Sequence, residues 1–505
     1  MKQCSELTCD NLPSTPRIDM GTVLVTGGTG YIGGRLVPEL LVLGYRVRVM
    51  VRAASPEYEQ RWPDVEIVVG DALNENDVCR VLEGVDTAYY LIHSMLVGLR
   101  RFEDADLTAA RNFRTAAEKQ GVNRIIYLGS LGDTHTQLSH HLASRARVAE
   151  ELAKGSVPIT ILRAAIIIGS GSASYEVINH LVRKIPVFLV PDWAKTKCQP
   201  VFIGDVIRWL VGVLDIPETS GRTFDLGGTD ILTYEQMLKM HAEILGRKRI
   251  FIRSPISHIG FFSYITSLLT PVPAAITWCL MEGVTHDVVC RDNDIQQLIP
   301  FRPMSCKEAL VMALSREEQD AVHTRWSDSY PPDYELAIKL SEIEGPPTYT
   351  CSYSLVTSQN TEPLFKSITH IGGRNGWFHS TFLWRMRGTI DRLLRGVGVT
   401  RGRRSASTLR VNDVVDFWRV EEICDCRQVL LRAEMKLPGY AWLEFRVDPI
   451  TPGKNRLSVN AYYETKGVWG HLYWYLFLPF HHFIFINLIQ QIERNSKLKN
   501  GSNSS

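Results

Sequence analysis

The most informative group in the sequence is three glycines, with two residues between each glycine and the next. Gly27, Gly30 and Gly33 follow the β-branched run Thr22–Thr26 and open a stretch typical of a helix. In such a turn the first glycine allows a sharp bend, the second lets the main chain approach a pyrophosphate, and the third lets helix and strand pack closely. The helix N-terminus also offers unpaired amides to an anion. We therefore predict that this turn binds a dinucleotide, with further contacts from Thr29, Tyr31 and Ile32. The alternative is a glycine-rich turn that binds nothing.

The residues that would meet the rest of the nucleotide favour NADP over NAD. An NAD site usually has a carboxylate near the end of the second strand, and here that place holds Arg52. A guanidinium there would pair with a 2′-phosphate, with help from Arg48, although a solvated arginine is the alternative. Asp71, after the third strand, is placed to meet the adenine or to cap the next helix. His93, at the end of the fourth strand, is placed near the nicotinamide ribose.

The elements that position these residues alternate between strand and helix. Helical stretches at 31–43, 105–120 and 139–154 separate most of the predicted strands. This alternation is typical of a parallel, doubly wound α/β sheet with helices on both faces. The predicted strands are 22–26, 46–51, 65–69, 87–92, 124–128 and 158–162.

The pattern changes twice further along the chain. The alternation loosens from about residue 165, which suggests a substrate lobe that completes a domain spanning 21–330. A linker rich in proline and acidic residues is predicted at 331–347. Residues 348–495 then read as antiparallel strands followed by a long aromatic helix, typical of a separate α+β domain. Polar tails are predicted at 1–20 and 496–505.

Composition excludes several classes of protein. The 505 residues include 45% apolar and 22% charged residues, with 56 Lys plus Arg against 54 Asp plus Glu. A net charge of +2 gives no overall attraction to nucleic acid, and no nucleic-acid motif is present. Ten cysteines are too sparse for a disulfide scaffold, and none has zinc-finger spacing. We expect a cytoplasmic protein of a reducing, intracellular compartment with no metal site, and membrane association is the alternative.

The motif from Thr26 to Gly33, together with Gly70-Asp71, resembles the atypical, NmrA-like members of the short-chain dehydrogenase/reductase superfamily. This resemblance covers roughly residues 21–330. The C-terminal part, with Ile371–Trp377 near its start, is similar to helix-grip domains of the START or SRPBCC type. The second resemblance implies an apolar ligand cavity between a curved sheet and a long helix.

The resemblance also implies candidate residues for proton transfer. Reductases of the superfamily use a serine together with Tyr-x-x-x-Lys. Ser130 occupies the place of the serine, but the following helix has His141 and Arg145 where tyrosine and lysine are expected. An imidazole can exchange a proton near neutral pH, whereas a guanidinium cannot. The predicted catalytic residues are Ser130, His141 and Arg145, of which Arg145 could bind a ribose or phosphate but not move a proton. The alternative is a bound but unused nucleotide.

Two hypotheses for function follow. The first is an NADPH-dependent oxidoreductase that acts on a small apolar or quinone-like substrate. The second is a dinucleotide-binding regulator or scaffold, similar to NmrA-type regulators or to the accessory subunit of respiratory complex I. The absence of Tyr-x-x-x-Lys favours the second. A lipid-binding protein with a structural nucleotide is a third interpretation.

A basic stretch and two apolar segments complete the sequence features. Residues 385–404 contain seven arginines and one carboxylate, which predicts an amphipathic helix with a solvated basic face. Contact with an anionic substrate, lipid or partner is the alternative. Residues 261–281 and 472–489 approach the length of a membrane span, but their prolines and the pair His481-His482 favour buried core helices.

Overall fold

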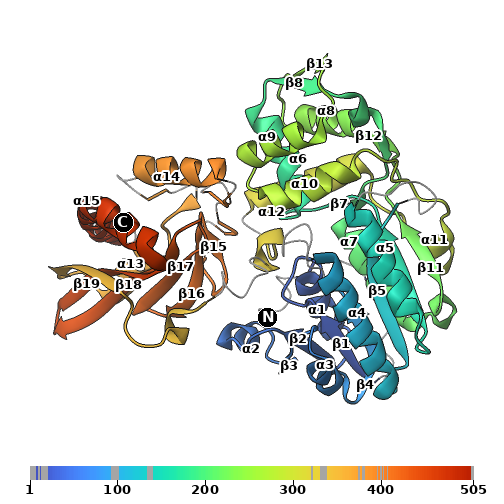
Figure 1. The fold of residues 1–505 in the computed structure, drawn as a ribbon, viewed down its shortest axis with the longest axis horizontal. Helices are drawn as coiled ribbons and strands as arrows, with labels where there is room; N and C mark the ends of the chain where they lie inside the picture. The colour runs from blue at the N-terminus through green and yellow to red at the C-terminus, as the bar shows by residue number, and fades with distance from the viewer. Residues whose placement is uncertain are drawn as a thin grey trace. The chain divides into compact units, whose positions relative to one another are not determined.

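The computed structural model describes residues 7–9, 12, 21–92, 102–132, 140–319, 322–329, 338–373, 376–377, 381–394, 396–398, 401, 403–405 and 408–501. The chain divides into two compact units (Figure 1). Unit 1 comprises Met1–Leu269 and Ala274–Pro332, and unit 2 comprises Thr270–Pro273 and Asp333–Ser505.

Unit 1 is built on a seven-stranded sheet in which every neighbouring pair is parallel. The strand order is β11-β6-β5-β4-β1-β2-β3, so the chain reverses its direction of winding between β1 and β4. In open parallel sheets a ligand binds outside the carboxyl ends of the strands at such a switch point. The strands are β1 Thr22–Thr26, β2 Val47–Val51, β3 Glu66–Val69, β4 Val85–Tyr90, β5 Arg124–Ser130, β6 Ile159–Ala164 and β11 Thr223–Leu226.

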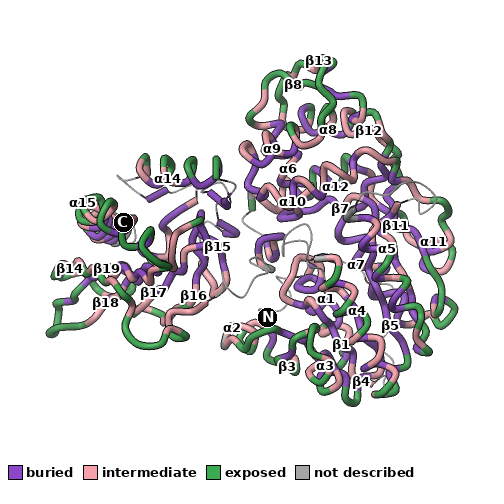
Figure 2. Tube along the Cα trace, viewed as in Figure 1, coloured by how far each residue is buried: buried purple, intermediate pink, exposed green. Residues whose placement is uncertain are grey.

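Helices cover both faces of this sheet because successive strand residues point to opposite sides. Val23 and Val25 of β1 belong to one buried cluster, which includes apolar residues of α1 (Gly33–Val42) and α7 (Ile203–Asp215). Leu24 belongs to a second cluster, formed with α3 (Glu75–Leu82), α4 (Phe102–Lys119) and α5 (His140–Ala153). The central strands β1, β2, β4 and β5 are buried almost throughout, whereas the edge strand β3 is partly exposed (Figure 2). The predicted doubly wound α/β fold is confirmed.

The six predicted strands all form, with ends within two residues of those expected. The strand β11 was missed, since it is short and follows the irregular lobe. It extends the sheet by pairing with β6 in register Thr223↔Ile161.

The rest of unit 1 forms a lobe of helices and two-stranded ribbons. The ribbons pair β10 with β7, β12 with β9 and β13 with β8. Side-chain caps at Thr233 and Ser305 start α8 and α12, in each case through a capping box. The elements are α2 Pro56–Arg61, β7 Ile167–Ile168, α6 Ala173–Lys184, β8 Val187–Val190, η2 Asp192–Lys195, β9 Lys197–Cys198, β10 Val201–Phe202, η3 Pro217–Thr219, β12 Leu232–Thr233, α8 Tyr234–Ile244, β13 Ile250–Arg253, α9 Ile259–Leu269, α10 Ala274–Gly283, α11 Asp294–Leu298, α12 Cys306–Glu318 and η4 Trp326–Ser329.

Unit 2 contains a six-stranded antiparallel sheet of order β14-β19-β18-β17-β16-β15. A long helix, α15, packs on β14 and β19 at one edge of the sheet. The predicted α+β domain is confirmed, and its helix-grip assignment stays a prediction. The elements are η6 Leu340–Glu342, β14 Tyr349–Thr357, α13 Thr361–Ile368, α14 Thr381–Leu393, β15 Val414–Val415, β16 Trp418–Cys424, β17 Gln428–Ala433, β18 Gly439–Thr451, β19 Lys454–Thr465 and α15 Gly467–Gly501.

The solvated basic face predicted for residues 385–404 is wrong for four of its arginines, which are buried. Arg401 and Arg419 both bind the carboxylate of Glu434, at 2.6 Å and 2.5 Å. Arg404 binds Asp413 at 2.7 Å. The sequence pattern was misleading because the carboxylates of Asp413, just before β15, and Glu434, just after β17, pair with Arg404 and Arg401 only after folding. The buried arginines are Arg392, Arg401, Arg403 and Arg404.

Candidate functional site: a dinucleotide turn at the switch point

The glycine turn has the geometry that its spacing predicts. Gly27 has φ 65°, in the region that favours glycine, and a Cβ there would lie 2.7 Å from the carbonyl oxygen of Leu91. A Cβ on Gly33 would lie 2.4 Å from the carbonyl oxygen of Gly27, so α1 can begin here only with glycine. A Cβ on Gly30 would meet a single atom within 4 Å, the Gly27 carbonyl oxygen at 3.3 Å. The space beside the main chain of Gly30 is therefore nearly unoccupied, so a ligand can approach the main chain there.

The start of α1 offers amides that have no backbone acceptor among the described residues. Ile32 is the N-cap residue, and its side chain makes no capping hydrogen bond. Among the described backbone hydrogen bonds, none is donated by the amides of Thr29, Tyr31 or Ile32. Such amides, at the positive end of a helix dipole, form a binding site for an anion. The turn thus fits a diphosphate.

Side-chain contacts hold the carboxyl ends of β1 and β4 together. The Thr26 hydroxyl donates to the Tyr89 carbonyl oxygen at 2.9 Å and accepts from the Leu91 amide at 3.0 Å. Thr26 therefore fixes the two strand ends between which the ligand of such a sheet binds.

The turn is also tied to two later segments of unit 1. Arg35, fully buried on α1, donates to the Ser170 carbonyl oxygen at 2.8 Å and lies over the Tyr31 ring. Thr324 donates to the Tyr31 carbonyl oxygen at 3.0 Å. The Trp326 amide donates to the Gly171 carbonyl oxygen at 2.9 Å. The nucleotide turn, the loop before α6 and the segment 322–329 therefore form one hydrogen-bonded junction.

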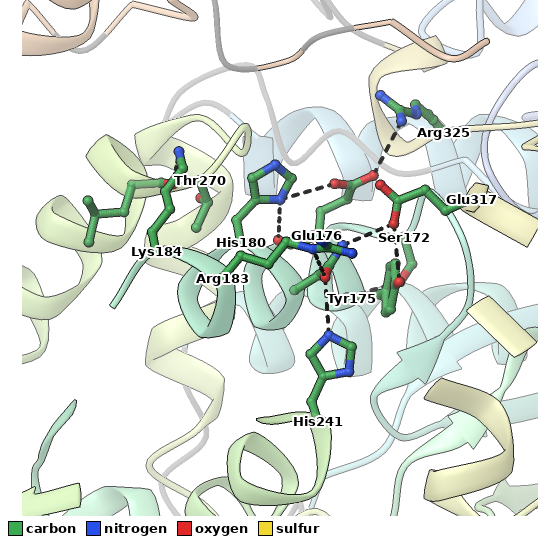
Figure 3. Close-up of polar contacts among 12 residues, drawn as sticks. Ser172, Tyr175, Glu176, His180, Arg183, Lys184, His241, Thr270, Glu317 and Arg325 are labelled. Atoms are coloured by element: carbon green, nitrogen blue, oxygen red, sulfur yellow. Dashed lines mark hydrogen bonds and ion pairs between the residues drawn. The ribbon is translucent and has the colours of Figure 1, made fainter. Parts of the chain in front are cut away.

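A cluster of polar side chains continues from this junction along α6 (Figure 3). Glu317 of α12 accepts from Asn179 at 3.0 Å and from the Tyr175 hydroxyl at 3.3 Å. The side-chain oxygen of Asn179 in turn accepts from Arg183 at 2.8 Å and lies 3.2 Å from Nε2 of His241. Three helices, α6, α8 and α12, are thus joined through polar groups.

Glu176 and His180 form the part of this cluster that can exchange a proton. The Glu176 carboxylate lies 3.4 Å from Nδ1 of His180 and 3.8 Å from Arg325. Burial raises the pKa of Glu176, against the opposing charge of Arg325. Burial lowers the pKa of His180 to about 4, so this imidazole is neutral at pH 7. Sequence analysis missed the pair; its only local signal was the four-residue spacing of Glu176 and His180 on a helix.

The predicted catalytic residues lie on β5 and α5. Ser130 is half-buried at the carboxyl end of β5, opposite Ala164 of β6. Arg145 is buried, donates to the carbonyl oxygens of Leu128 and Ile92, and lies 4.9 Å over the Tyr127 ring. Its guanidinium therefore holds the ends of β4 and β5. His141 lies in α5, and its side chain is outside the described part of the chain.

The predicted ribose and adenine residues are placed as follows. Arg52 is exposed just beyond β2. Arg48, the expected helper, instead binds Glu66 at 2.8 Å and the Val81 and Glu83 carbonyl oxygens, because its side chain crosses toward the end of α3. Asp71 accepts from the Leu73 amide at 3.0 Å, and Asn74 caps α3. His93 lies outside the described residues.

Comparisons with known proteins agree with this geometry. Residues 27–183 match a family model described as NAD(P)H-binding, and residues 346–488 match a protein family of unknown function, DUF2867. No group of three or more His, Cys, Asp or Glu side chains suited to a metal ion occurs among the described residues.

Two curated relatives span most of their own length in the match. One is the NADH dehydrogenase [ubiquinone] 1 alpha subcomplex subunit 9, mitochondrial, of Arabidopsis thaliana, 26% identical over 55% of this chain and 74% of the relative. The other is the ceramide reductase of Caulobacter vibrioides, 27% identical over 46% of this chain and 74% of the relative.

Among solved structures, a nucleoside-diphosphate-sugar epimerase from Staphylococcus aureus is 16% identical and covers 57% of this chain and 99% of its own, with a TM-score of 0.47. Residues 27–183 are therefore similar to NAD(P)H-binding proteins, and residues 346–488 are similar to the DUF2867 family.

Proposed function

We propose that the protein is an NAD(P)H-dependent oxidoreductase acting on an apolar or quinone-like substrate. The observation that carries the proposal is the start of α1, where the amides of Thr29, Tyr31 and Ile32 have no described backbone acceptor beside the bare main chain of Gly30. A diphosphate is the ligand that such a turn fits, at the switch point of a parallel sheet. The similarity to a ceramide reductase supports an apolar substrate.

The residues that would hold the nucleotide follow from this placement. Gly27 to Gly33 would bind the diphosphate, and Arg52, beyond β2, would pair with a 2′-phosphate, which favours NADP over NAD. Asp71 and His93 are proposed for the adenine and the nicotinamide ribose. The dinucleotide, when bound, supplies or accepts a hydride.

The protein's part in the chemistry is to orient the substrate and to move a proton. Ser130, at the end of β5, would donate a hydrogen bond to the substrate carbonyl oxygen. His141 is the proposed proton donor. Arg145 serves as a positioning residue for the ends of β4 and β5.

A dinucleotide-binding scaffold is the second candidate function. Arg145 stands where the family's lysine is expected, and its guanidinium is engaged by main-chain carbonyl oxygens rather than directed to a substrate. Similarity to a complex I subunit supports this alternative.

Calorimetric titration with NADPH and NADH, followed by turnover assays on quinones and long-chain ketones, tests the proposal. We expect tighter NADPH binding in the wild type than in Arg52→Ala, and NADPH oxidation that Ser130→Ala lowers about 100-fold without changing NADPH affinity. Ser156→Ala, at an exposed position, is the matched control. Binding of NADPH without oxidation across the substrates favours the scaffold, and no binding of either nucleotide contradicts both functions.

A further inference from the structure

The long helix of unit 2, α15, is apolar around its circumference but buried on one side only. Its buried side includes Trp474, Phe485, Leu488 and Ile492, each 5% exposed or less. Seven large apolar side chains on the rest of the helix are between 47% and 81% exposed. They are Val468, Trp469, Leu472, Tyr475, Leu476, Phe480 and Phe483. We call these seven residues the outer face of α15. A contiguous exposed apolar surface of this size marks a contact site.

Aromatic contacts fix the inner side of α15 to the sheet. The rings of Tyr349 on β14 and Tyr463 on β19 both stack on Trp474, with centroids 5.1 Å and 5.6 Å away. The ring centroids of Tyr353 and Phe485 are 5.9 Å apart. By length and composition, Gly467–Lys497 could cross a membrane. A crossing would separate Trp474 and Phe485 from their partners, whereas a position parallel to a membrane surface keeps these contacts.

The charges around the outer face are positive. No Asp or Glu occurs between Glu464 and Glu493. Glu464 accepts two hydrogen bonds from Thr348 at 2.9 Å, and Glu493 binds Lys497 at 2.8 Å. Lys466 and Arg494 are exposed at the two ends. The outer face itself carries no carboxylate, and the exposed cations at its two ends are complementary to lipid phosphates.

We propose that the outer face of α15 binds the surface of an anionic lipid bilayer, with the helix axis parallel to the membrane plane. Trp469 and Tyr475 have the amphipathic rings that favour the headgroup level, and Leu472, Leu476, Phe480 and Phe483 reach the start of the acyl chains. A second copy of the chain fits less well. A symmetric contact between two outer faces would offer the bordering cations only Glu464 and Glu493, which are already engaged by Thr348 and Lys497. The proposal is independent of the proposed oxidoreductase activity.

Co-sedimentation of the full chain with vesicles tests the proposal. We expect the wild type to sediment with vesicles of phosphatidylcholine mixed with phosphatidylglycerol, and less with phosphatidylcholine alone. The triple variant Trp469→Asp, Leu472→Asp, Leu476→Asp should lose binding about tenfold or more. The matched control, Val187→Asp, Ile250→Asp, Ile252→Asp, changes three exposed apolar residues of unit 1 and should sediment like the wild type. If the triple variant does not fold, the single variants Leu472→Asp and Leu476→Asp replace it.

Two results would overturn the proposal. One is a wild type that stays in the supernatant with anionic vesicles. The other is an α15 variant that sediments as the wild type does. Light scattering identifies the competing occupant: a wild-type dimer that the α15 substitutions dissociate, without vesicle binding, assigns the outer face to a second copy.

Discussion

Arg35 donates a hydrogen bond of 2.8 Å to the carbonyl oxygen of Ser170. The first residue lies on the helix that follows the nucleotide turn, and the second lies in the loop before α6. Burial lowers the pKa of Arg35, yet a guanidinium stays charged at any physiological pH. This charged donor therefore fixes the position of the α6 loop relative to the dinucleotide turn, so that the Glu176–His180 pair and the turn belong to one rigid arrangement within unit 1.

Gly33→Ala is expected to weaken dinucleotide binding. The added Cβ would lie 2.4 Å from the Gly27 carbonyl oxygen and 2.7 Å from the Gly28 Cα, both main-chain atoms that cannot move without opening the turn. We expect a loss of roughly tenfold or more in affinity, equivalent to about 1.4 kcal/mol or more. Calorimetric titration with NADPH measures it.

Gly283→Ala is the control for that substitution. A Cβ at Gly283 meets nothing within 4 Å, so the same chemical change there should leave the affinity unaltered. Unchanged NADPH binding in Gly33→Ala would show that the turn does not hold the diphosphate.

The fold of unit 1 could be predicted because its signals are local. The strand Thr22–Thr26, the glycines that follow it and the helix beyond lie within one short stretch, and periodicity identifies each of them. The strand β11 could not be predicted, since four residues carry little periodic signal and its pairing with β6 is set by the whole lobe.

The candidate site could be predicted only where it is contiguous in sequence. Gly27, Gly30 and Gly33 carry their own spacing, whereas Ser170 and Thr324 join the turn through hydrogen bonds from distant segments. The same limit explains Arg401. A run of arginines looks solvated when the acidic partner of one of them, Glu434, lies further along the chain, just after β17.

Arg145→Met is expected to destabilise unit 1. The substitution keeps an unbranched side chain over the Tyr127 ring, but it removes the donor to the carbonyl oxygens of Leu128 and Ile92. Leaving such buried acceptors unsatisfied should lower the free energy of unfolding by about 2–4 kcal/mol. Chemical denaturation measures this loss. The exposed substitution Arg147→Met on the same helix should cost much less.

A third variant, Arg145→Lys, separates a positioning role of Arg145 from a catalytic one. If Arg145 acts only by holding the ends of β4 and β5, Arg145→Lys restores part of the stability and leaves the pH profile of any turnover unchanged. A shifted pH profile in a fully stable Arg145→Lys protein would instead place the guanidinium in contact with the reacting groups.

His241 is expected to make the stability of unit 1 depend on pH. Burial, together with the charge of Arg183, lowers the pKa of His241 to about 4. The unfolded chain binds a proton near pH 6.5, so between pH 6.5 and 4 the unfolded state holds more protons than the folded state. Stability is therefore fully present above pH 6.5 and is lost as the pH falls toward 4.

His241→Gln should remove that contribution while keeping a donor for the Asn179 oxygen, which lies 3.2 Å from Nε2 in the wild type. We expect the difference in unfolding free energy between pH 7 and pH 4.5 to shrink by about 2–3 kcal/mol. Denaturant titrations at the two pH values measure it, with His286→Gln as the control. An equal pH dependence in His241→Gln and the wild type would contradict this assignment.

Glu434→Gln is expected to destabilise unit 2 more than any surface substitution on the same sheet. Burial opposes ionisation of this carboxyl, but the charges of Arg419 and Arg401 outweigh burial and lower its pKa. The glutamine would leave two buried guanidinium groups without their shared carboxylate, which typically costs about 3–5 kcal/mol.

Glu422→Gln, exposed on the neighbouring strand β16, makes the same chemical change without uncovering a buried charge and should cost less than about 0.5 kcal/mol. Denaturation of the two variants compares them directly. Similar stabilities would mean that solvent reaches the arginines around Glu434, and the buried network would then contribute little to holding the antiparallel sheet together.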